Sequence, residues 1–451
     1  RTPEAFVLDA DLKVRYHGRI DDQFGAGFQR SNANRQDLAI AVDEVLAGKK
    51  VTVATTEVAG CLIGRTKTAT VADAKVNYSK HVAPIIQNRC QECHRPGQIG
   101  PMPLLNYDDV SSWSAMIREV VSEKRMPPWH ADDKQHGVFS NERSLSKEDY
   151  DTLLSWIDQG CAEGNKADLP APRQFADNWY IGKPDAIISM PQEFTVPAKA
   201  PKGGVRYQNF TVKTNFTEDK WIQAAECKPG NKAVVHHIIA FVDSGKKVDL
   251  VEGLGYGMLS AYAPGDIGSA FPAGAALKLP KGASIRFQMH YTPNGVECKD
   301  RSSVGLVFAK QTPKIEVQAR AIANLFFNIP PGQANHEVRS ESTFKKDAIV
   351  YSLLPHMHLR GKDFKFEVVY PDGKTNTILN VPRYDFGWQA KYHFKEPLKV
   401  PAGTKIKCLA HFDNSKGNPW NPDPTVSVRF GEQTWEEMMI GFIDYAYVEK
   451  Q

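Results

Sequence analysis

The sequence predicts a multidomain chain with a partial α/β segment, an all-α domain and two all-β, jelly-roll-like sandwiches. The chain has 451 residues, which is too long for one hydrophobic core. Apolar residues recur at helical spacing between residues 76 and 164, and short alternating strands separated by Pro, Gly, Asn and Asp follow from about residue 183. Because these ~270 residues exceed the size of one sandwich, we expect two, at 180–311 and 312–451.

Composition and charge narrow the classes of partner. Hydrophobic residues make up 41% of the chain and charged residues 24%, as in an ordinary globular protein. The formal net charge of +4 is weak and no basic run accompanies it, so we do not expect a nucleic-acid partner. No apolar run reaches the ~18 residues of a transmembrane helix. The chain begins with Arg1, so a removed or missing leader stays open.

The first segment, residues 1–65, combines strands with a helix. Apolar residues over 5–9 and alternation over 13–17 predict two strands. Helical spacing predicts a helix over 37–46. The segment therefore has a small α/β character.

Residues 76–164 are expected to form the all-α domain. Helical spacing predicts helices over 76–90, 112–124 and 146–160. Pro127 and Pro128 break the pattern after the second helix. Ser146 can cap the third helix and Gly160 can end it.

A Cys-x-x-Cys-His motif lies at the end of the first of these helices, at Cys90, Cys93 and His94. This motif is the attachment signature of c-type haem, in which two thiols bond the porphyrin and the histidine ligates iron. A redox dithiol and half of a zinc site are the alternatives. They are less favoured because a second cysteine pair is missing and the motif does not connect a strand to a helix. The sequence predicts one covalent haem c.

Haem iron needs a sixth ligand. We expect Met126, in the turn Arg-Met-Pro-Pro-Trp, where the neighbouring prolines would present the thioether rigidly. Met102, His130 and His136 are the alternatives. Ligation by His and Met raises the haem potential, which suits electron transfer.

Residues 76–164 resemble small bacterial cytochrome c domains. The resemblance rests on the CQECH motif, the RMPPW turn and a closing helix with the sequence LLSWI before Gly160. It implies an all-α cytochrome c domain. Because c-type haem is attached outside the cytoplasm, it also implies a periplasmic location in a bacterium.

Five histidines form three clusters in the β-rich half, at His236, His237, His290, His356 and His358. Successive strand side chains point to opposite faces, so His356 and His358 share a face and can chelate one metal. His290 points away from the apolar face that precedes it. The adjacent His236 and His237 can reach one ion only at a strand end or a distortion. A lone strand histidine is usually structural, but this arrangement of five predicts metal binding.

The spacing leaves the identity of the metal open, because imidazole suits copper, zinc, iron and nickel. A thioether ligand would favour Cu(I), since soft ligands select that ion. Met438 and Met439, which follow an acidic pair near the C-terminus, are the candidates.

Residues 200–451 resemble the copper type II, ascorbate-dependent monooxygenases, the family of peptidylglycine hydroxylating and dopamine β-monooxygenases. The resemblance rests on the order HH, QMHY, IPPG, HMH and EEM, with the IPPG at 329–332 opening the second sandwich. It implies two coppers in different sandwiches, across an open cleft. The electron-transfer copper would be held by His236, His237 and His290, and the O₂-binding copper by His356, His358 and Met438.

Two departures from the family pattern bear on the substrate. The peptide-amidating member carries an Arg before its His-x-His and a Tyr after its Met ligand, both for the peptide carboxylate. Leu354 and Phe442 occupy those positions here. The resemblance therefore implies a neutral or apolar small organic substrate instead of a peptide carboxylate.

The cysteines also depart from the family pattern. Met439 replaces a family cysteine that bonds a strand cysteine, so Cys408 is expected to stay free. Cys227 and Cys298 are candidates for a disulfide within the first sandwich.

Residues 1–65 resemble the C-terminal part of a thioredoxin-like, peroxiredoxin-type domain. The resemblance rests on Thr2-Pro3, the strand after it, the sequence RIDD at 19–22, and Gly60-Cys61. The half that would carry the active-site cysteines is absent, so we interpret this segment as a partial domain without redox activity.

Taken together, these resemblances imply a copper-dependent monooxygenase that hydroxylates an unknown small substrate with O₂. The upstream haem would relay electrons from an external donor to two coppers. The main alternative is a non-catalytic periplasmic electron-transfer or copper-binding protein. A different redox enzyme and an adhesion module with incidental histidines are further alternatives.

Overall fold

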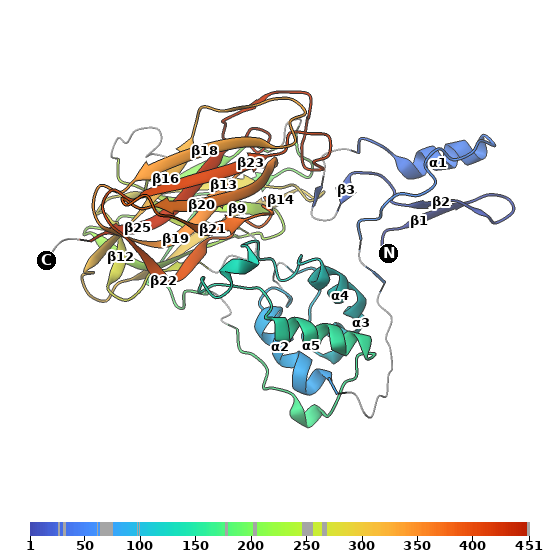
Figure 1. The fold of residues 1–451 in the computed structure, drawn as a ribbon, viewed down its shortest axis with the longest axis horizontal. Helices are drawn as coiled ribbons and strands as arrows, with labels where there is room; N and C mark the ends of the chain where they lie inside the picture. The colour runs from blue at the N-terminus through green and yellow to red at the C-terminus, as the bar shows by residue number, and fades with distance from the viewer. Residues whose placement is uncertain are drawn as a thin grey trace. The chain divides into compact units, whose positions relative to one another are not determined.

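The computed structural model describes residues 1–25, 28–29, 33–60, 62–63, 75–96, 98, 100–175, 179–201, 205–245, 256–263 and 268–448. The chain divides into two compact units (Figure 1). We call residues 1–128 with 143–174 the N-terminal unit, and residues 129–142 with 175–451 the β unit. No helix in this described part is long and apolar enough to span a bilayer.

The N-terminal unit starts with the strands and helix expected near the beginning of the chain. β1 (Ala5–Leu8) pairs antiparallel with β2 (Val14–Gly18), and α1 (Asp37–Leu46) packs on them through Ala41 and Tyr16. These three predictions are confirmed. β3 (Phe24–Gly25) and β4 (Phe28–Gln29) form a separate pair, and Cys61 lies outside the described residues.

The predicted helices lie in the same unit. The helix predicted over 76–90 is formed by η1 (Tyr78–Val82) and α2 (Ala83–Arg89), that over 112–124 by α4 (Ser114–Ser122), and that over 146–160 by α5 (Lys147–Asp158). Two short helices that were not predicted, α3 (Tyr107–Ser112) and η3 (Lys166–Asp168), lie in the same unit. The predicted cap of α5 is confirmed, because Ser146 Oγ accepts a hydrogen bond from the Asp149 N–H at 3.0 Å. The fully buried Trp156 anchors α5 in the core of these helices.

The expected fold class is wrong. The structure is predominantly β, with 36% strand and 14% helix, and no all-α cytochrome c domain is apparent in the described part of the chain. The short helices share one unit with β1, β2 and α1, and residues 129–142 of the expected helical domain belong to the β unit. The physical reason is that helical spacing reports local structure only. It carries no information about which elements pack together.

One nine-stranded sheet runs through the β unit. Its strands in order are β22 (Tyr392–Val400), β19 (Ala348–His356), β25 (Met439–Tyr447), β16 (Ile315–Asn324), β12 (Ala275–Leu279), β8 (Lys220–Lys228), β15 (Ser303–Phe308) and β5 (Ala186–Ser189), with β11 (Ser269–Ala270) beside β8. The two halves join where β12 and β16 pair in parallel, with Ala275 opposite Ile315. The expected pair of sandwiches therefore shares a continuous sheet.

Two four-stranded sheets and two short pairs complete the unit. One sheet has the order β10 (Met258–Tyr262), β9 (Val235–Asp243), β13 (Ser284–Tyr291), β7 (Gln208–Lys213). The other has the order β18 (His336–Thr343), β23 (Lys405–Phe412), β20 (Gly361–Val369), β21 (Thr375–Val381). The short pairs are β6 (Phe194–Val196) with β14 (Cys298–Asp300) and β17 (Asn328–Ile329) with β24 (Val428–Arg429).

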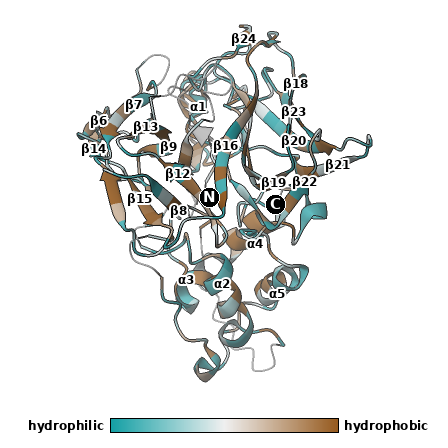
Figure 2. Ribbon diagram, turned by 90° about the vertical axis from the view of Figure 1, so that its left-hand side faces the viewer, coloured by the Kyte–Doolittle hydropathy of each residue, from teal (hydrophilic) through white to brown (hydrophobic). Residues whose placement is uncertain are grey.

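Each four-stranded sheet packs against one half of the long sheet. Ile285, Phe287 and Met289 alternate along β13, are fully buried and meet side chains of β8 and β15 in one core. A second core joins β20 and β23 to β19 and β25. The hydrophobic residues that form these layers are brown in Figure 2. The apolar face predicted for β13 is confirmed.

Residues 129–142 pack onto the second core although their sequence neighbours belong to the N-terminal unit. The Trp129 ring lies 4.9 Å from the Tyr392 ring and the Phe139 ring lies 5.4 Å from it, measured between centroids. The Ser140 N–H donates to the His393 carbonyl at 2.8 Å. A short helix, η2 (Asp133–Gln135), lies within the segment.

We expect Phe139→Ala to destabilise the β unit by about 3–5 kcal/mol, because it leaves a cavity among aromatic rings. Phe139 is 3% exposed, and a urea titration followed by circular dichroism measures the change. Phe326→Ala is the matched control, since Phe326 is 91% exposed, and should change stability by less than ~0.5 kcal/mol. Equal effects of the two substitutions would contradict this role of Phe139.

Candidate metal centre

Strands β9 and β13 bring three of the predicted histidines together. The strands pair antiparallel, with His290 opposite His237 and Tyr291 opposite Val235. His236 is therefore an extra residue in β9, which makes a β-bulge at the end of the strand. The bulge is the distortion that adjacent histidines require if both are to face one point.

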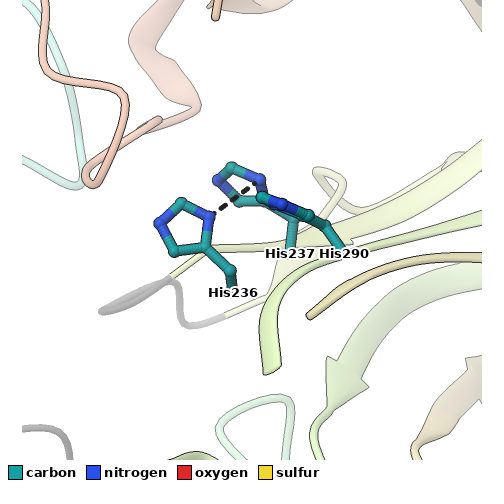
Figure 3. Close-up of side chains that lie close together, drawn as sticks. All are labelled: His236, His237 and His290. Atoms are coloured by element: carbon teal, nitrogen blue, oxygen red, sulfur yellow. Dashed lines mark hydrogen bonds between the residues drawn. The ribbon is translucent and has the colours of Figure 1, made fainter. Parts of the chain in front are cut away.

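The three imidazoles form a compact group that can hold a metal ion. One nitrogen from each of His236, His237 and His290 lies within 4.8 Å of the others. Figure 3 shows the three rings gathered close together, with a dashed line between His236 and His237. The Nδ1 atoms of these two residues are 3.2 Å apart. The buried Nδ1 of His290 has no hydrogen-bond partner among the described residues. An orphaned buried nitrogen of this kind fits a missing metal bond.

Burial keeps these imidazoles neutral. It lowers the pKa of His236 to about 4 and the pKa values of His237 and His290 well below the ordinary value. The neighbouring histidines lower the pKa values of His237 and His290 further. A neutral imidazole has one nitrogen lone pair, so no ring of the group must lose an extra proton before it ligates at neutral pH.

The second histidine pair lies at the end of β19. His356 is the last residue of the strand and pairs with Ile440 of β25, and His358 follows two residues later. Their ring centroids are 5.3 Å apart. Burial lowers the pKa of His356 to about 4 and that of His358 to about 3. The Nε2 atom of His358 is buried and has no hydrogen-bond partner in the described part of the structure.

The buried carboxyl group of Glu437 positions His358. Both Glu437 oxygens accept backbone hydrogen bonds, from the His358 N–H at 2.8 Å and the Arg360 N–H at 2.6 Å. His358 Nδ1 lies 3.2 Å from the Glu436 carbonyl, so it can donate there and leave Nε2 as the ligating atom. Burial raises the pKa of Glu437 to about 8, against these hydrogen bonds. Glu437 had no predicted role, although its place in the EEM motif was the available signal.

The two candidate methionine ligands, Met438 and Met439, lie in different hydrophobic clusters. Met438 directly follows Glu437 and lies in an apolar cluster with Leu354 and Phe442. Met439 is fully buried in the second core, where its sulfur accepts a hydrogen bond from Ser340 Oγ at 3.3 Å. This placement removes Met439 as a ligand for the His356–His358 pair. Met438 stays the candidate.

Gln389 and Phe386 contact both histidine groups. Gln389 Oε1 lies 2.6 Å from His356 Nδ1, and its Nε2 lies 3.1 Å from His237 Nε2. The Phe386 ring stacks on His236 at 5.0 Å and lies 6.0 Å from the His358 ring. The resemblance implies an open cleft between the two copper sites. In the structure, the side chains of Gln389 and Phe386 instead contact both histidine groups. Neither residue was predicted from the sequence, because neither belongs to a motif.

Two residues lie together at the positions where the peptide-amidating enzyme has the Arg and Tyr that bind the peptide carboxylate. Leu354 on β19 pairs with Phe442 on β25, and both are buried beside Met438. The wall next to the second histidine pair is therefore apolar. It offers no charge to a carboxylate.

The predicted haem motif forms a compact turn in the N-terminal unit. Cys90 ends α2, and its carbonyl accepts the N–H groups of Cys93 at 3.1 Å and His94 at 3.0 Å. His94 Nδ1 lies 3.0 Å from the Met102 carbonyl, which leaves Nε2 for a ligand. A side chain at Gly100 would meet the Cys93 carbonyl at 2.7 Å and the His94 ring at 2.8 Å, so the turn requires glycine there.

The candidates for the sixth ligand lie in different units. Met126 and Met102 belong to the same unit as His94, whereas His130 and His136 belong to the β unit. His136 Nδ1 lies 2.6 Å from a Glu142 carboxylate oxygen. Met126 remains a prediction.

The candidate disulfide between Cys227 and Cys298 is not formed in the structure. Cys298 on β14 carries a free thiol, and the Cys227 thiol on β8 donates to the Ser260 carbonyl at 3.6 Å. The two cysteines lie on strands of different sheets. Cys408 is a free, buried thiol in the second core.

Comparisons with known proteins assign no family. No family model and no curated protein matches the chain. The major capsid protein P2 from Bacteriophage PM2 is 6% identical, over 59% of this chain and 98% of that chain, with a TM-score of 0.24. PNGF-II is 8% identical, over 59% of this chain and 66% of that chain, with a TM-score of 0.28. These scores are too low to support an argument about fold or function.

We expect Glu437→Gln to destabilise the β unit by about 1–3 kcal/mol, because an amide nitrogen cannot accept the second backbone N–H. Urea unfolding of the metal-free protein measures this change. Glu436→Gln is the control: Glu436 accepts the single N–H of Gln433 at 2.9 Å, which the amide oxygen can still accept. A Glu437→Gln protein as stable as the control would contradict the proposed support of His358.

Proposed function

We propose that this protein is a copper-dependent oxidoreductase of the monooxygenase type, which hydroxylates a small neutral molecule with O₂. The observation that carries the proposal is the gathering of five imidazoles from distant strands, with orphaned nitrogens on His290 and His358. Structural histidines in a core normally have hydrogen-bond partners for their buried nitrogens. Ligand-binding histidines leave one nitrogen open.

The donor sets fit two copper ions of different character. His236, His237 and His290 would hold one ion through nitrogen alone, and His356, His358 and Met438 would hold the other. Imidazole suits several metals, but a thioether favours Cu(I). When bound, copper would supply one-electron redox chemistry at each site, so that two sites together hold the electron pair that hydroxylation consumes.

The reaction balances with two external electrons. A substrate C–H, O₂, two electrons and two protons give an alcohol and one water. The chain contributes neutral, buried imidazoles and the Glu437 contact that fixes His358. Phe386 covers the three-histidine group and limits access of water to it. The apolar pair Leu354 and Phe442 favours a neutral or apolar substrate over a peptide carboxylate.

A covalent haem would deliver the electrons one at a time. Cys90 and Cys93 would attach it and His94 would ligate its iron, with Met126 as the sixth ligand. The hydrogen-bond distance between His94 Nδ1 and the Met102 carbonyl supports a ligating Nε2. Because c-type haem is attached outside the cytoplasm, the proposal includes a periplasmic location.

One observation favours a second candidate function, a non-catalytic electron-transfer or copper-binding protein. His356, His358 and Met438, which would hold the O₂-binding copper, are all buried among the described residues, each at most 9% exposed. A covered copper site of this kind can exchange electrons without admitting a substrate.

Met438→Leu should slow the reaction of the reduced, copper-loaded protein with O₂ by at least about tenfold, since loss of even an outer-shell partner costs about 10–100-fold. Anaerobic stopped-flow mixing with O₂ measures the rate. Met439→Leu is the control, because Met439 packs in the second core and this swap conserves volume. If O₂ oxidises neither haem nor copper in the unaltered protein, the monooxygenase proposal fails and the electron-transfer function is favoured.

Cys90→Ala should abolish one of the two thioether bonds and cut covalent haem yield severely when the chain is exported with haem-attachment machinery. In-gel haem staining after denaturation measures covalent attachment. Cys298→Ala removes a thiol outside the motif and should retain full staining. Equal staining of both variants would remove Cys90 from its proposed role.

A further inference from the structure

A single amide side chain lies between the two histidine groups and touches one imidazole of each. Gln389 is buried, with Oε1 2.6 Å from His356 Nδ1 and Nε2 3.1 Å from His237 Nε2. Its Nε2 also donates to the Phe386 carbonyl at 3.2 Å. Because that carbonyl only accepts hydrogen bonds, the amide nitrogen must face it, and the amide orientation is fixed.

This orientation dictates which nitrogen of each ring carries the proton. His356 donates its Nδ1–H to the amide oxygen, so its Nε2 lone pair is open to a metal. His237 accepts from the amide N–H at Nε2, so the proton of this neutral ring is on Nδ1. The 3.2 Å contact between the Nδ1 atoms of His237 and His236 agrees, since one of them must donate to the other.

The amide of Gln389 therefore leaves a ligating nitrogen open on His356 of the second histidine pair, but not on His237 of the three-histidine group. His237 is attached to Gln389 through Nε2, so only Nδ1 is left to face the three-histidine group. Nδ1 can ligate only if its proton moves to Nε2, where it would meet the N–H of Gln389. The opposite orientation of the amide would free His237 but would put a donor against His356 Nδ1, which would move the proton of His356 to its ligating Nε2.

We propose that Gln389 couples the two metal sites, so that filling the three-histidine site breaks the amide contact that orients the other site. The inference rests on the proposed function, since it takes both histidine groups as copper sites. The first ion enters the His356–His358 site. The second ion binds at least roughly tenfold more weakly, because one buried hydrogen bond must be given up.

Two substitutions separate this coupling from repulsion between the ions. Gln389→Glu supplies a carboxylate that can accept from His356 Nδ1–H and His237 Nε2–H at the same time, so both rings can ligate, and it gives up the hydrogen bond to the Phe386 carbonyl. Gln389→Leu removes both contacts. Gln318→Glu is the matched control, because Gln318 is exposed and its Oε1 accepts from the Tyr445 hydroxyl, as a carboxylate also can.

Calorimetric titration of the metal-free, full-length protein with copper(II) tests the proposal, with copper content checked by electron paramagnetic resonance. We expect two unequal binding events in the unaltered protein and in Gln318→Glu. In Gln389→Glu and Gln389→Leu the gap between the two dissociation constants should shrink by roughly tenfold. His290→Gln should keep the tighter event and lose the weaker one.

The possible failures are distinguishable. An equal gap in all four proteins would overturn the role of Gln389 and leave the two copper sites standing. No copper uptake by the unaltered protein would overturn the proposed function itself. Nitrogen chemical shifts of ¹⁵N-labelled histidine in the unaltered, metal-free protein give a test that needs no Gln389 variant: His237 and His356 should both carry the proton on Nδ1, and a proton on His237 Nε2 would refute the coupling.

Discussion

The pairing of β9 with β13 is the constraint on which the candidate centre depends. Ile238 and Ala240 on β9, and Ile285 and Phe287 on β13, are fully buried in one core. A slip of one residue in β13 would turn Ile285 and Phe287 away from that core and place Arg286 and Gln288 in it. The register is therefore fixed by hydrophobic burial, and it sets His290 opposite His237. The bulge at His236 then adds the third imidazole at no cost to the buried face.

Around this centre, buried hydrogen bonds orient side chains and backbone groups that strand pairing does not position. Each contact satisfies a group that would be costly to bury unpaired: Glu437 receives two backbone N–H groups, and Gln389 meets a partner at both ends. The histidines nevertheless retain orphaned nitrogens beside these satisfied groups. That contrast is what distinguishes a site built for a ligand from a polar core, and it supports the proposed copper chemistry better than the number of histidines does.

Sequence patterns predicted the local elements well and the assembly poorly. The helix over 37–46 and the cap at Ser146 follow from neighbouring residues, so periodicity and capping chemistry were sufficient. The fold class failed because a sequence gives no sign that residues 129–142 pack against Tyr392, or that β12 pairs with β16. These contacts depend on long-range packing, which no local pattern reports.

The candidate site shows the same division. The histidines could be predicted because their spacing along the strands indicates which of them share a face. Gln389 and Phe386 lie in an irregular connection between β21 and β22, where no such spacing applies. A glutamine and a phenylalanine in a loop are ordinary residues, and only the fold brings them to the imidazoles. The sequence left the pairing of Cys227 with Cys298 open for a related reason, because pairing two cysteines requires knowing which strands carry them and how those strands lie.

The assignment of residues 129–142 to the β unit has a consequence for the modularity of the protein. The backbone passes from one unit to the other at residues 128–129, 142–143 and 174–175, so neither unit is a contiguous stretch. A gene fragment that starts after residue 174 would omit the aromatic side chains that cover Tyr392. The two units therefore cannot be exchanged as separate contiguous modules. A gene segment that encodes the whole of one unit also encodes part of the other.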